Sequence, residues 1–155
     1  MTTPFTIRIE PAGSPVAQAL IAALDAEIMR IYPGDTVNGI DAERFEASGG
    51  VFVVCSVAGE PVACGAIRVW EEHAEVKRMY VAPAFRGRGL GRQVLRYIEN
   101  LAVERGFTEG VLETGGSQPA AEALYKSEGW TPRGLFGPYT NPASTCFEKR
   151  LAQKQ

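Results

Sequence analysis

A loop rich in glycine and arginine, within "RMYVAPAFRGRGLGRQV" at residues 78–94, has the residue types and spacing to bind an anion. Its glycines stand at alternate positions, where the backbone can approach a ligand that any side chain would push away. Its arginines add guanidinium groups, which bind phosphate through paired hydrogen bonds. The loop residues concerned are Arg86, Gly87, Arg88, Gly89, Gly91 and Arg92. A tight turn with a solvated basic surface is the simpler alternative, but this density of glycine and arginine favours a pyrophosphate-bearing ligand.

The sequence on either side of this loop predicts a strand before it and a helix after it. "HAEVKRMYVAP" predicts the strand, and Leu90, Val94, Ile98 and Leu101 then share one face of a helix that reaches about residue 105. The start of a helix offers unpaired N–H groups and the positive end of its dipole, which together bind phosphate. The loop is not a Walker A motif, because "GxxxxGK[ST]" is absent. It also differs from the dinucleotide-binding pattern, because it follows a fourth predicted strand rather than a first.

The rest of the chain predicts a mixed α/β sheet covered by helices. We expect strands in "FTIRIE", on both sides of an "AGEP" turn in "GGVFVVCSVAGEPVACGAIRVW", in "FTEGVLET" and in "STCFEKRL". Helices are expected after the candidate N-cap Ser14, at residues 41–47 and in "QPAAEALYKSEG". The predicted order is β-α-(α)-β-β-β-α-β-α-β, and we expect one domain over residues 1–155.

The first of these helices is expected to be amphipathic. Val16, Leu20, Leu24, Ile28 and Ile31 recur on one face of it, and "YPGD" is expected to end it.

The composition is that of an ordinary globular protein, with 45% hydrophobic and 22% charged residues. No stretch approaches the roughly 20 apolar residues that span a bilayer, and "MTTPFTIRIE" lacks the features of a secretion signal. Three scattered cysteines argue against a disulfide framework and for a reducing compartment. We therefore expect a cytoplasmic protein with no membrane partner.

Two of the cysteines belong to the predicted hairpin. Cys55 and Cys64 would face each other if its turn centred on Gly59-Glu60, and packing explains them better than a redox pair or a metal site. No ligand set for zinc is present, so no metal is expected.

Charge is divided unevenly along the chain. Residues 1–76 hold four basic and eleven acidic residues, a balance of −7, whereas residues 77–155 hold twelve basic and seven acidic, a balance of +5. Chance surface composition explains this as well as function does. The functional hypothesis is that the basic half holds an anion while the acidic half attracts a cationic amine.

Two motifs resemble those of the GCN5-related N-acetyltransferases, the GNAT family. "YVAPAFRGRGLG" is similar to the family's motif A, (Gln/Arg)-x-x-Gly-x-(Gly/Ala), with Arg86, Gly89 and Gly91 in its places. "AAEALYKSEGW" is similar to its second motif, a helix reading A-x-x-x-Y followed by glycine and an aromatic residue. The two motifs stand in the right order at a typical separation, and the predicted elements match the family fold over essentially the whole chain.

The resemblance implies a mostly antiparallel sheet that splays between its fourth and fifth strands, with helices on both faces and acetyl-CoA in the gap. Met79, Tyr80 and Val81 would lie along the pantetheine arm, and a strand N–H near Met79 or Tyr80 would bind the acetyl carbonyl oxygen. The segment Arg86, Gly87, Arg88, Gly89, Leu90, Gly91 and Arg92 would surround the pyrophosphate. Gln118 departs from the family's asparagine at its position, with the same amide on a longer arm.

The resemblance also implies two catalytic residues. Tyr125 takes the place of the tyrosine that protonates the departing CoA thiolate, although a core aromatic with a satisfied hydroxyl is the alternative. Glu75 is the first candidate for the base, with a structural salt bridge as the alternative. By strand alternation Glu75 shares a face with Lys77, Met79 and Val81. His73 is a weaker candidate because it stands near the start of the strand.

The acceptor would be a primary amine on a small molecule or a peptide. Its pocket would form from the first helix and its loop, the third and fourth strands and the loop "GLFGPYTNPAS". The aromatic and turn features there are better explained by packing than by substrate contact: "YPGD", Trp70, Phe136 and Tyr139. A non-catalytic acyl-CoA sensor on the same fold stays open, as does homodimerisation. A nucleic-acid binder is disfavoured by the pI of about 5.5 and by the lack of aromatics clustered along the basic segment.

Overall fold

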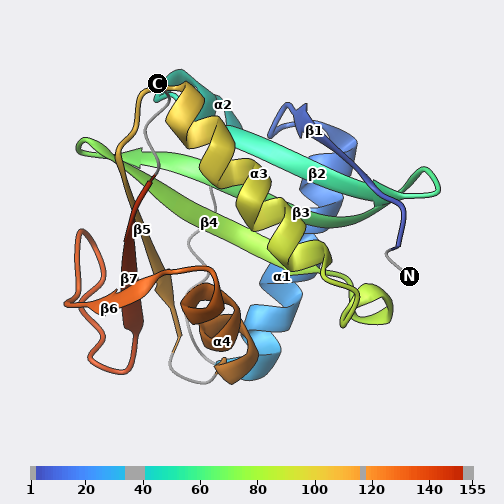
Figure 1. Ribbon diagram of the computed structural model, residues 1–155. Helices are drawn as coiled ribbons and strands as arrows, with labels where there is room; N and C mark the ends of the chain where they lie inside the picture. Colours follow the sequence, from blue (N-terminus) through green and yellow to red (C-terminus); the bar gives the residue numbers. More distant parts are fainter. Residues whose placement is uncertain (1–2, 34–40, 116–117, 152–155) are drawn as a thin grey trace.

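A seven-stranded sheet forms the centre of the protein in the computed structural model, which describes residues 3–33, 41–115 and 118–151 (Figure 1). The strands are β1 (Thr6–Glu10), β2 (Val51–Val57), β3 (Glu60–Trp70), β4 (His73–Val81), β5 (Glu109–Thr114), β6 (Thr131–Arg133) and β7 (Thr145–Arg150). Their order across the sheet is β1-β2-β3-β4-β5-β7-β6. All neighbours are antiparallel except β4 and β5, which are parallel.

Helices cover both faces of this sheet. They are α1 (Pro15–Ile31), α2 (Ala42–Ala47), α3 (Leu90–Glu104) and α4 (Pro119–Ser127), and a short 3-10 turn at Pro83–Phe85 precedes α3. In Figure 1, α3 crosses the front of the sheet and α1 lies behind it. One core lies under α3 and α4, and a second lies under α1 and α2. The expected α/β fold is therefore confirmed. None of the helices described is long and apolar enough to cross a membrane.

Local sequence signals explain where the helices begin. The Ser14 hydroxyl accepts a hydrogen bond from the Ala17 N–H at 3.1 Å, and the Asp41 carboxylate accepts one from the Arg44 N–H at 3.0 Å. The four apolar residues predicted to share a face of α3 are all buried: Leu90, Val94, Ile98 and Leu101. Burial of that face holds α3 on the sheet.

The sheet opens between β4 and β5. These strands pair at only three positions, the last of which joins Val76 to Leu112. Beyond this position β4 continues to Val81 and β5 to Thr114, but the two strands no longer pair with each other. Figure 1 shows them diverging, with α4 near their separated ends. The sheet is therefore splayed where the family resemblance placed the cofactor gap.

A β-bulge interrupts β4 next to this opening. Cys64 pairs with Tyr80 and Ala66 pairs with Lys77, so two steps along β3 match three along β4. Arg78 takes up the extra length with a φ of +59°, in the left-handed region. A bulge bends its strand and re-aims the neighbouring backbone groups.

The bulge overturns one prediction about β4. Met79 and Val81 pack into the core under α3, whereas Glu75 and Lys77 lie on the opposite face. The expectation that all four share a face was wrong, because strict alternation along a strand holds only while no residue is inserted.

The β2–β3 hairpin also differs from its expected register. Its turn is the pair Ala58-Gly59, with φ of +50° and +81°, which is the backbone geometry of tight two-residue hairpins. With this turn and a register shift between Cys55 and Ser56, Cys55 pairs with Ala63, and Cys64 with Val54. The two cysteines belong to different cores and do not face each other, so their expected juxtaposition was wrong.

Two further differences concern the ends of elements. Ile31, predicted on the apolar face of α1, is 41% exposed because it occupies the last helical position. Strand β6 was not predicted, because a strand of three residues that includes Pro132 is too short to display alternation.

The segment "YPGD" was expected to end the first helix. Tyr32 is the C-cap of α1, whereas Gly34 and Asp35 lie outside the described residues.

Candidate active site

The glycine-rich loop leads from β4 into α3 and leaves its backbone available to a ligand. Gly87 and Gly89 have φ values of +78° and +79°, and a side chain at either position would meet no atom within 4 Å. Gly89 is the N-cap of α3 and supplies no side-chain acceptor. The first turn of α3 thus keeps N–H groups for an anion, as a pyrophosphate site requires.

The loop arginines differ in how far they are already engaged. Arg86 lies 2.5 Å from the Glu27 carboxylate of α1, and its Nε donates to the Val81 carbonyl at 2.8 Å. Arg88 is exposed, with its guanidinium 5.0 Å from the centre of the Phe85 ring. An incoming phosphate would therefore find Arg88 without a carboxylate partner among the described residues, but would compete with Glu27 for Arg86.

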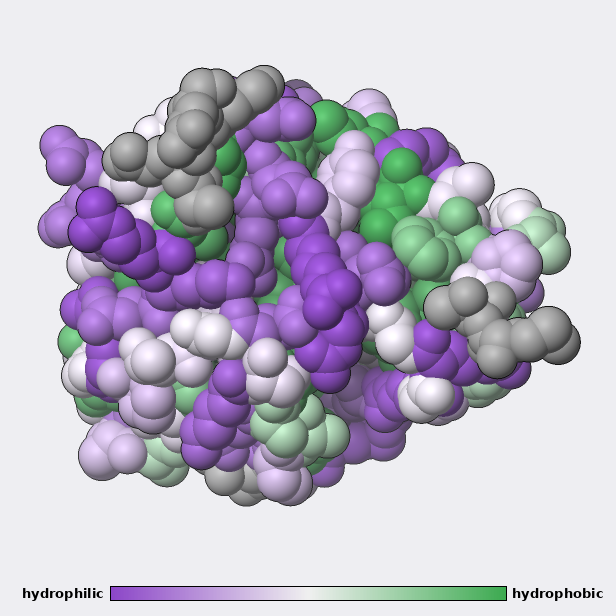
Figure 2. Space-filling model, in the orientation of Figure 1, coloured by the Kyte–Doolittle hydropathy of each residue, from purple (hydrophilic) through white to green (hydrophobic). Residues whose placement is uncertain are grey.

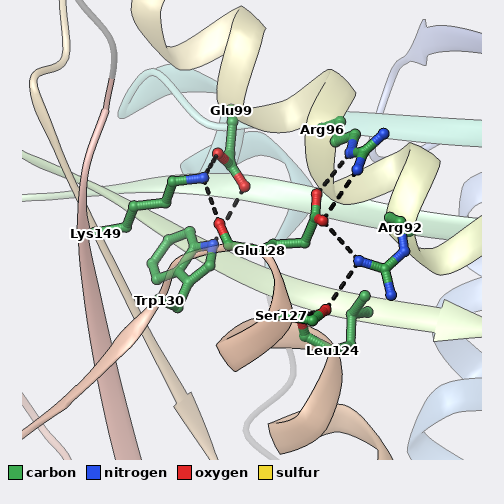
Figure 3. Close-up of polar contacts among 8 residues, drawn as sticks. All are labelled: Arg92, Arg96, Glu99, Leu124, Ser127, Glu128, Trp130 and Lys149. Atoms are coloured by element: carbon green, nitrogen blue, oxygen red, sulfur yellow. Dashed lines mark hydrogen bonds and ion pairs between the residues drawn. The ribbon is translucent and has the colours of Figure 1, made fainter.

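Arg92 belongs to a cluster that ties α3 to α4 (Figure 3). Glu128, just past α4, accepts hydrogen bonds at 2.6 Å from both Arg96 and Arg92, and Arg92 also reaches the Ser127 hydroxyl at 2.9 Å. Arg96 and then Arg92 hold the pKa of Glu128 down at about 2. Hydrophilic side chains of this kind cover the outer surface of α3 (Figure 2). The cluster fixes the position of α4 relative to the loop.

In the part of the chain that the structure describes, one edge of β4 has no neighbouring strand beyond Val76. Its other edge still pairs with β3 at Lys77, Tyr80 and Val81. The predicted pantetheine residues therefore lie along a strand edge whose backbone groups have no partner strand, next to the bulge. An extended ligand can add to such an edge as another strand would.

Tyr125 lies in the core on the α4 side of the opening. Its ring packs against those of Trp130 and Phe147, with centroids 6.3 and 6.1 Å away. Burial raises the pKa of Tyr125 well above its ordinary value, so the phenol keeps its proton. The adjacent Leu124 would come within 3.6 Å of a side chain at Gly91, so this part of α4 adjoins the glycine-rich loop. Tyr125 is thus a packed core aromatic that also stands beside the predicted cofactor site.

Two polar residues lie at the open end of β5 and at the start of α4. The Thr114 hydroxyl is buried and has no hydrogen-bond partner within the described part of the chain. Gln118 is the N-cap of α4, but its side chain makes no capping hydrogen bond. A buried hydroxyl without a partner calls for a ligand or a water molecule, so this region fits the polar arm of acetyl-CoA.

Glu75 forms a hydrogen-bonded chain with two other residues on the opposite face of the sheet. It is 2% exposed, and its carboxylate accepts a 2.5 Å hydrogen bond from the Tyr139 hydroxyl. The Lys77 ammonium donates to the same hydroxyl at 2.6 Å and lies 3.8 Å from the Glu75 carboxylate. Burial lowers the pKa of Lys77, and burial together with the Glu75 hydrogen bond raises that of Tyr139. The Glu75 carboxylate therefore has the salt bridge named as the alternative to a catalytic role, and it also accepts a hydrogen bond from a phenol.

The loop after β6 brings Tyr139 to this position. Phe136 is 4% exposed and packs between Trp70 and Tyr139, with ring centroids 4.9 and 5.1 Å away. Gly137 lies against the Trp70 indole, where a Cβ would come within 2.9 Å of its nitrogen. Phe136 and Trp70 are therefore packing residues, as expected, whereas Tyr139 also contacts the predicted base. His73 stacks on Trp70 at 5.2 Å and joins no part of the Glu75 chain.

Lys77 and Arg78 were missed as functional candidates on this face, and Tyr139 was considered near the acceptor pocket but interpreted as a packing residue. Lys77 and Tyr139 contact each other and Glu75, and Arg78 reaches from the bulge to Asp25 of α1 at 2.8 Å. No periodic signal links Glu75 to a tyrosine 64 positions away. Only the clustering of aromatic residues in "GLFGPY" marked this loop in the sequence.

The acidic and basic halves of the chain neutralise each other at these contacts. Asp25 pairs with Arg78, Glu27 with Arg86 and Glu75 with Lys77. The hypothesis of a free acidic surface for a cationic amine did not anticipate these pairs. Within residues 3–33, 41–115 and 118–151, no three His, Cys, Asp or Glu side chains gather as metal ligands would.

Known proteins match both the sequence and the fold. The profile of the Acetyltransferase (GNAT) family matches residues 19–130. An IAA acetyltransferase from Azospirillum brasilense is 38% identical over 147 residues, covering 93% of this chain and 95% of the relative. A Klebsiella pneumoniae structure classed as an acyl-CoA N-acyltransferase is 34% identical, with a TM-score of 0.82 over 97% of this chain and all of the other. An Elizabethkingia anophelis GNAT acetyltransferase with acetyl-CoA bound, 20% identical, shares the fold with a TM-score of 0.71 over 95% and 98% of the two chains.

The splayed sheet and the glycine-rich loop at a helix N-terminus are the architecture of an acetyl-CoA-dependent acyltransferase. The chain belongs to the GNAT family, and it is an N-acetyltransferase.

Proposed function

We propose that the protein transfers the acetyl group of acetyl-CoA directly to a primary amine, with both substrates bound at once. The observation that carries this proposal is the position of the opening between β4 and β5. A protonated phenol, Tyr125, stands on the side of α4, and the Glu75 chain stands on the opposite face where the strands part. An acyl transfer needs an acid within reach of the departing sulfur and a base within reach of the attacking amine.

The residues that hold the donor are those of the free strand edge and the loop. Met79, Tyr80 and Val81 would bind the pantetheine arm, and the backbone N–H groups at the bulge would bind the acetyl oxygen. The residues from Arg86 to Arg92 would hold the pyrophosphate, and Gln118 would contact the arm. Acetyl-CoA supplies an activated thioester; the chain supplies position and proton transfer.

Glu75 would act on the amine through Tyr139. The Tyr139 hydroxyl covers the carboxylate, so a proton from the acceptor nitrogen passes to the phenol oxygen while the phenol proton passes to Glu75. The free amine pair then forms the new C–N bond as the C–S bond breaks, and Tyr125 gives its proton to the departing CoA sulfur. The nitrogen releases its second proton as it becomes the amide, and a proton taken back through solvent restores the Tyr125 phenol.

The test of this mechanism is Tyr125→Phe in an assay of CoA thiol release across a panel of primary amines. We expect kcat to fall about 100-fold or more, as for loss of a general acid, with the Kd for acetyl-CoA unchanged. Tyr97→Phe is the matched control, because Tyr97 is half-buried on α3 and its hydroxyl makes no hydrogen bond within the described residues. Equal rates in the Tyr125→Phe variant and wild type would contradict the assignment.

Saturable acetyl-CoA binding without CoA release on any amine of the panel would contradict this mechanism and return the non-catalytic sensor that the sequence left open. We further propose a cytoplasmic enzyme whose residues 1–155 act as one domain, supported by three buried free cysteines.

A further inference from the structure

Arg68 is a charged residue on the acceptor face that the mechanism above does not use. It lies on β3 directly opposite Glu75 of β4, so the two side chains project from the same face of the sheet. Arg68 is exposed. Within the described residues it makes no hydrogen bond and no ion pair closer than 4 Å, although a buried carboxylate stands on the neighbouring strand.

The other charges of this face are committed elsewhere. The Glu75 carboxylate takes the Tyr139 hydroxyl and the Lys77 ammonium, and Glu113 of β5 accepts the Ser144 hydroxyl at 2.7 Å. Arg78, also on this face, is paired with Asp25. Arg68 is thus a guanidinium beside the proposed acceptor position that forms no ion pair within 4 Å among the described residues.

Lys77 gives a second reason to expect an anion here. Burial is the main cause that lowers the pKa of Lys77; Arg78 and Arg68 lower it further by charge repulsion, whereas Glu75 and Glu113 raise it. Glu75 is already the ion-pair partner of Lys77, so Arg68 adds a second positive charge beside a carboxylate that is already engaged. An anionic group on the substrate would relieve that repulsion and give the guanidinium its paired hydrogen bonds.

We propose that Arg68 binds a carboxylate carried by the acceptor itself, so that the substrate is a compact zwitterion of the α-amino acid class. This inference rests on the proposed N-acetyltransferase function. The amine would lie at Tyr139 and Glu75, and the carboxylate at Arg68 one strand away. Cβ atoms of paired residues on adjacent strands are only about 5 Å apart, a spacing that suits two charged groups on one small molecule.

The experiment compares each of the twenty L-amino acids with its amide, which keeps the size and the amine but removes the negative charge. Wild-type protein is expected to release CoA faster with amino acids than with their amides. In Arg68→Gln, the KM for the preferred amino acid should rise about tenfold or more, as for loss of a charge-assisted hydrogen bond, while the KM for its amide and for acetyl-CoA stay unchanged. Arg68→Lys should restore part of the preference.

Arg8→Gln is the matched control, because Arg8 is an exposed arginine on β1 at the far edge of the same sheet. The inference would be overturned if the wild-type protein prefers amides, or if Arg68→Gln loses activity equally on amino acids and amides. Either result would leave the acetyltransferase function standing. Absence of CoA release with every acceptor would overturn the function instead. In that case thermal shift decides the inference: stabilisation by amino acids but not amides, lost in Arg68→Gln, supports it, and its absence refutes it.

Discussion

At the residue scale, the Tyr139 hydroxyl joins two groups of opposite charge. It donates to Glu75 and accepts from Lys77, and both of these side chains are largely buried. The raised pKa of Tyr139 keeps the phenol neutral, which is the form that can donate and accept at once. A neutral relay of this kind allows a carboxylate to receive a proton without being exposed to solvent.

Replacing Tyr139 by phenylalanine should affect both stability and turnover. The buried Glu75 carboxylate would lose its hydroxyl donor, so we expect the free energy of unfolding to fall by about 1–3 kcal/mol in urea titrations. We also expect kcat to fall about 10- to 100-fold with an unchanged Kd for acetyl-CoA, because the proton path is broken.

The control for this change is again Tyr97→Phe, which removes a tyrosine hydroxyl that bonds to nothing described. If Tyr139→Phe lowers stability but leaves kcat at the wild-type value, Tyr139 only supports Glu75 and is not part of the proton path.

At the element scale, the approach of α3 to β3 depends on one glycine. A Cβ at Gly65 would lie 2.5 Å from Ile98 Cδ1 and 2.8 Å from Met79 Sδ. Interiors are packed too densely to absorb such an overlap without movement. Gly65 therefore permits α3, and the loop that precedes it, to lie against the sheet where β4 bulges.

We expect Gly65→Ala to reduce the free energy of unfolding by about 1–3 kcal/mol through overpacking, measured by urea titration. Gly134→Ala is the matched control, because a Cβ there meets nothing within 4 Å and its φ is not positive. Equal stability of the two alanine variants would show that α3 does not press on β3 as described.

At the scale of the whole molecule, ion pairs connect the two halves of the chain across the site. Helix α1, on the acceptor face, carries both Asp25 and Glu27, which pair with Arg78 of the bulge and Arg86 of the loop. The pyrophosphate of acetyl-CoA would compete with Glu27 for Arg86. Donor binding is therefore expected to change a contact between α1 and the glycine-rich loop.

Removal of that competition should tighten donor binding. We expect Glu27→Gln to lower the Kd for CoA by up to about fivefold at low salt, since a surface ion pair is worth about 0.2–1 kcal/mol. Isothermal titration at low and high salt would measure it, and the effect should shrink as salt screens the charges. Glu104→Gln, at the exposed end of α3, is the control. Weaker CoA binding by Glu27→Gln would contradict the idea that Glu27 and the pyrophosphate compete for Arg86.

Local patterns were sufficient to predict most elements and the donor loop. Capping at Ser14, the apolar face of α3 and the glycine spacing at residues 87–91 all depend on neighbours within one or two turns. These short-range signals can be found in the sequence because the backbone conformation of each segment follows from its own residues.

The acceptor face was decided by tertiary structure alone. The bulge at Arg78 separated Met79 from Glu75, and a loop 64 residues away placed Tyr139 on that carboxylate. Arg68 stands opposite Glu75 only because β3 and β4 pair in this register. The strand register, the residue inserted at the bulge and the contact between Tyr139 and Glu75 all depend on how the whole sheet packs. No single segment of the sequence determines them. The sequence by itself therefore determined the family and the glycine-rich loop, and the folded chain determined which charged side chains lie together beside Glu75.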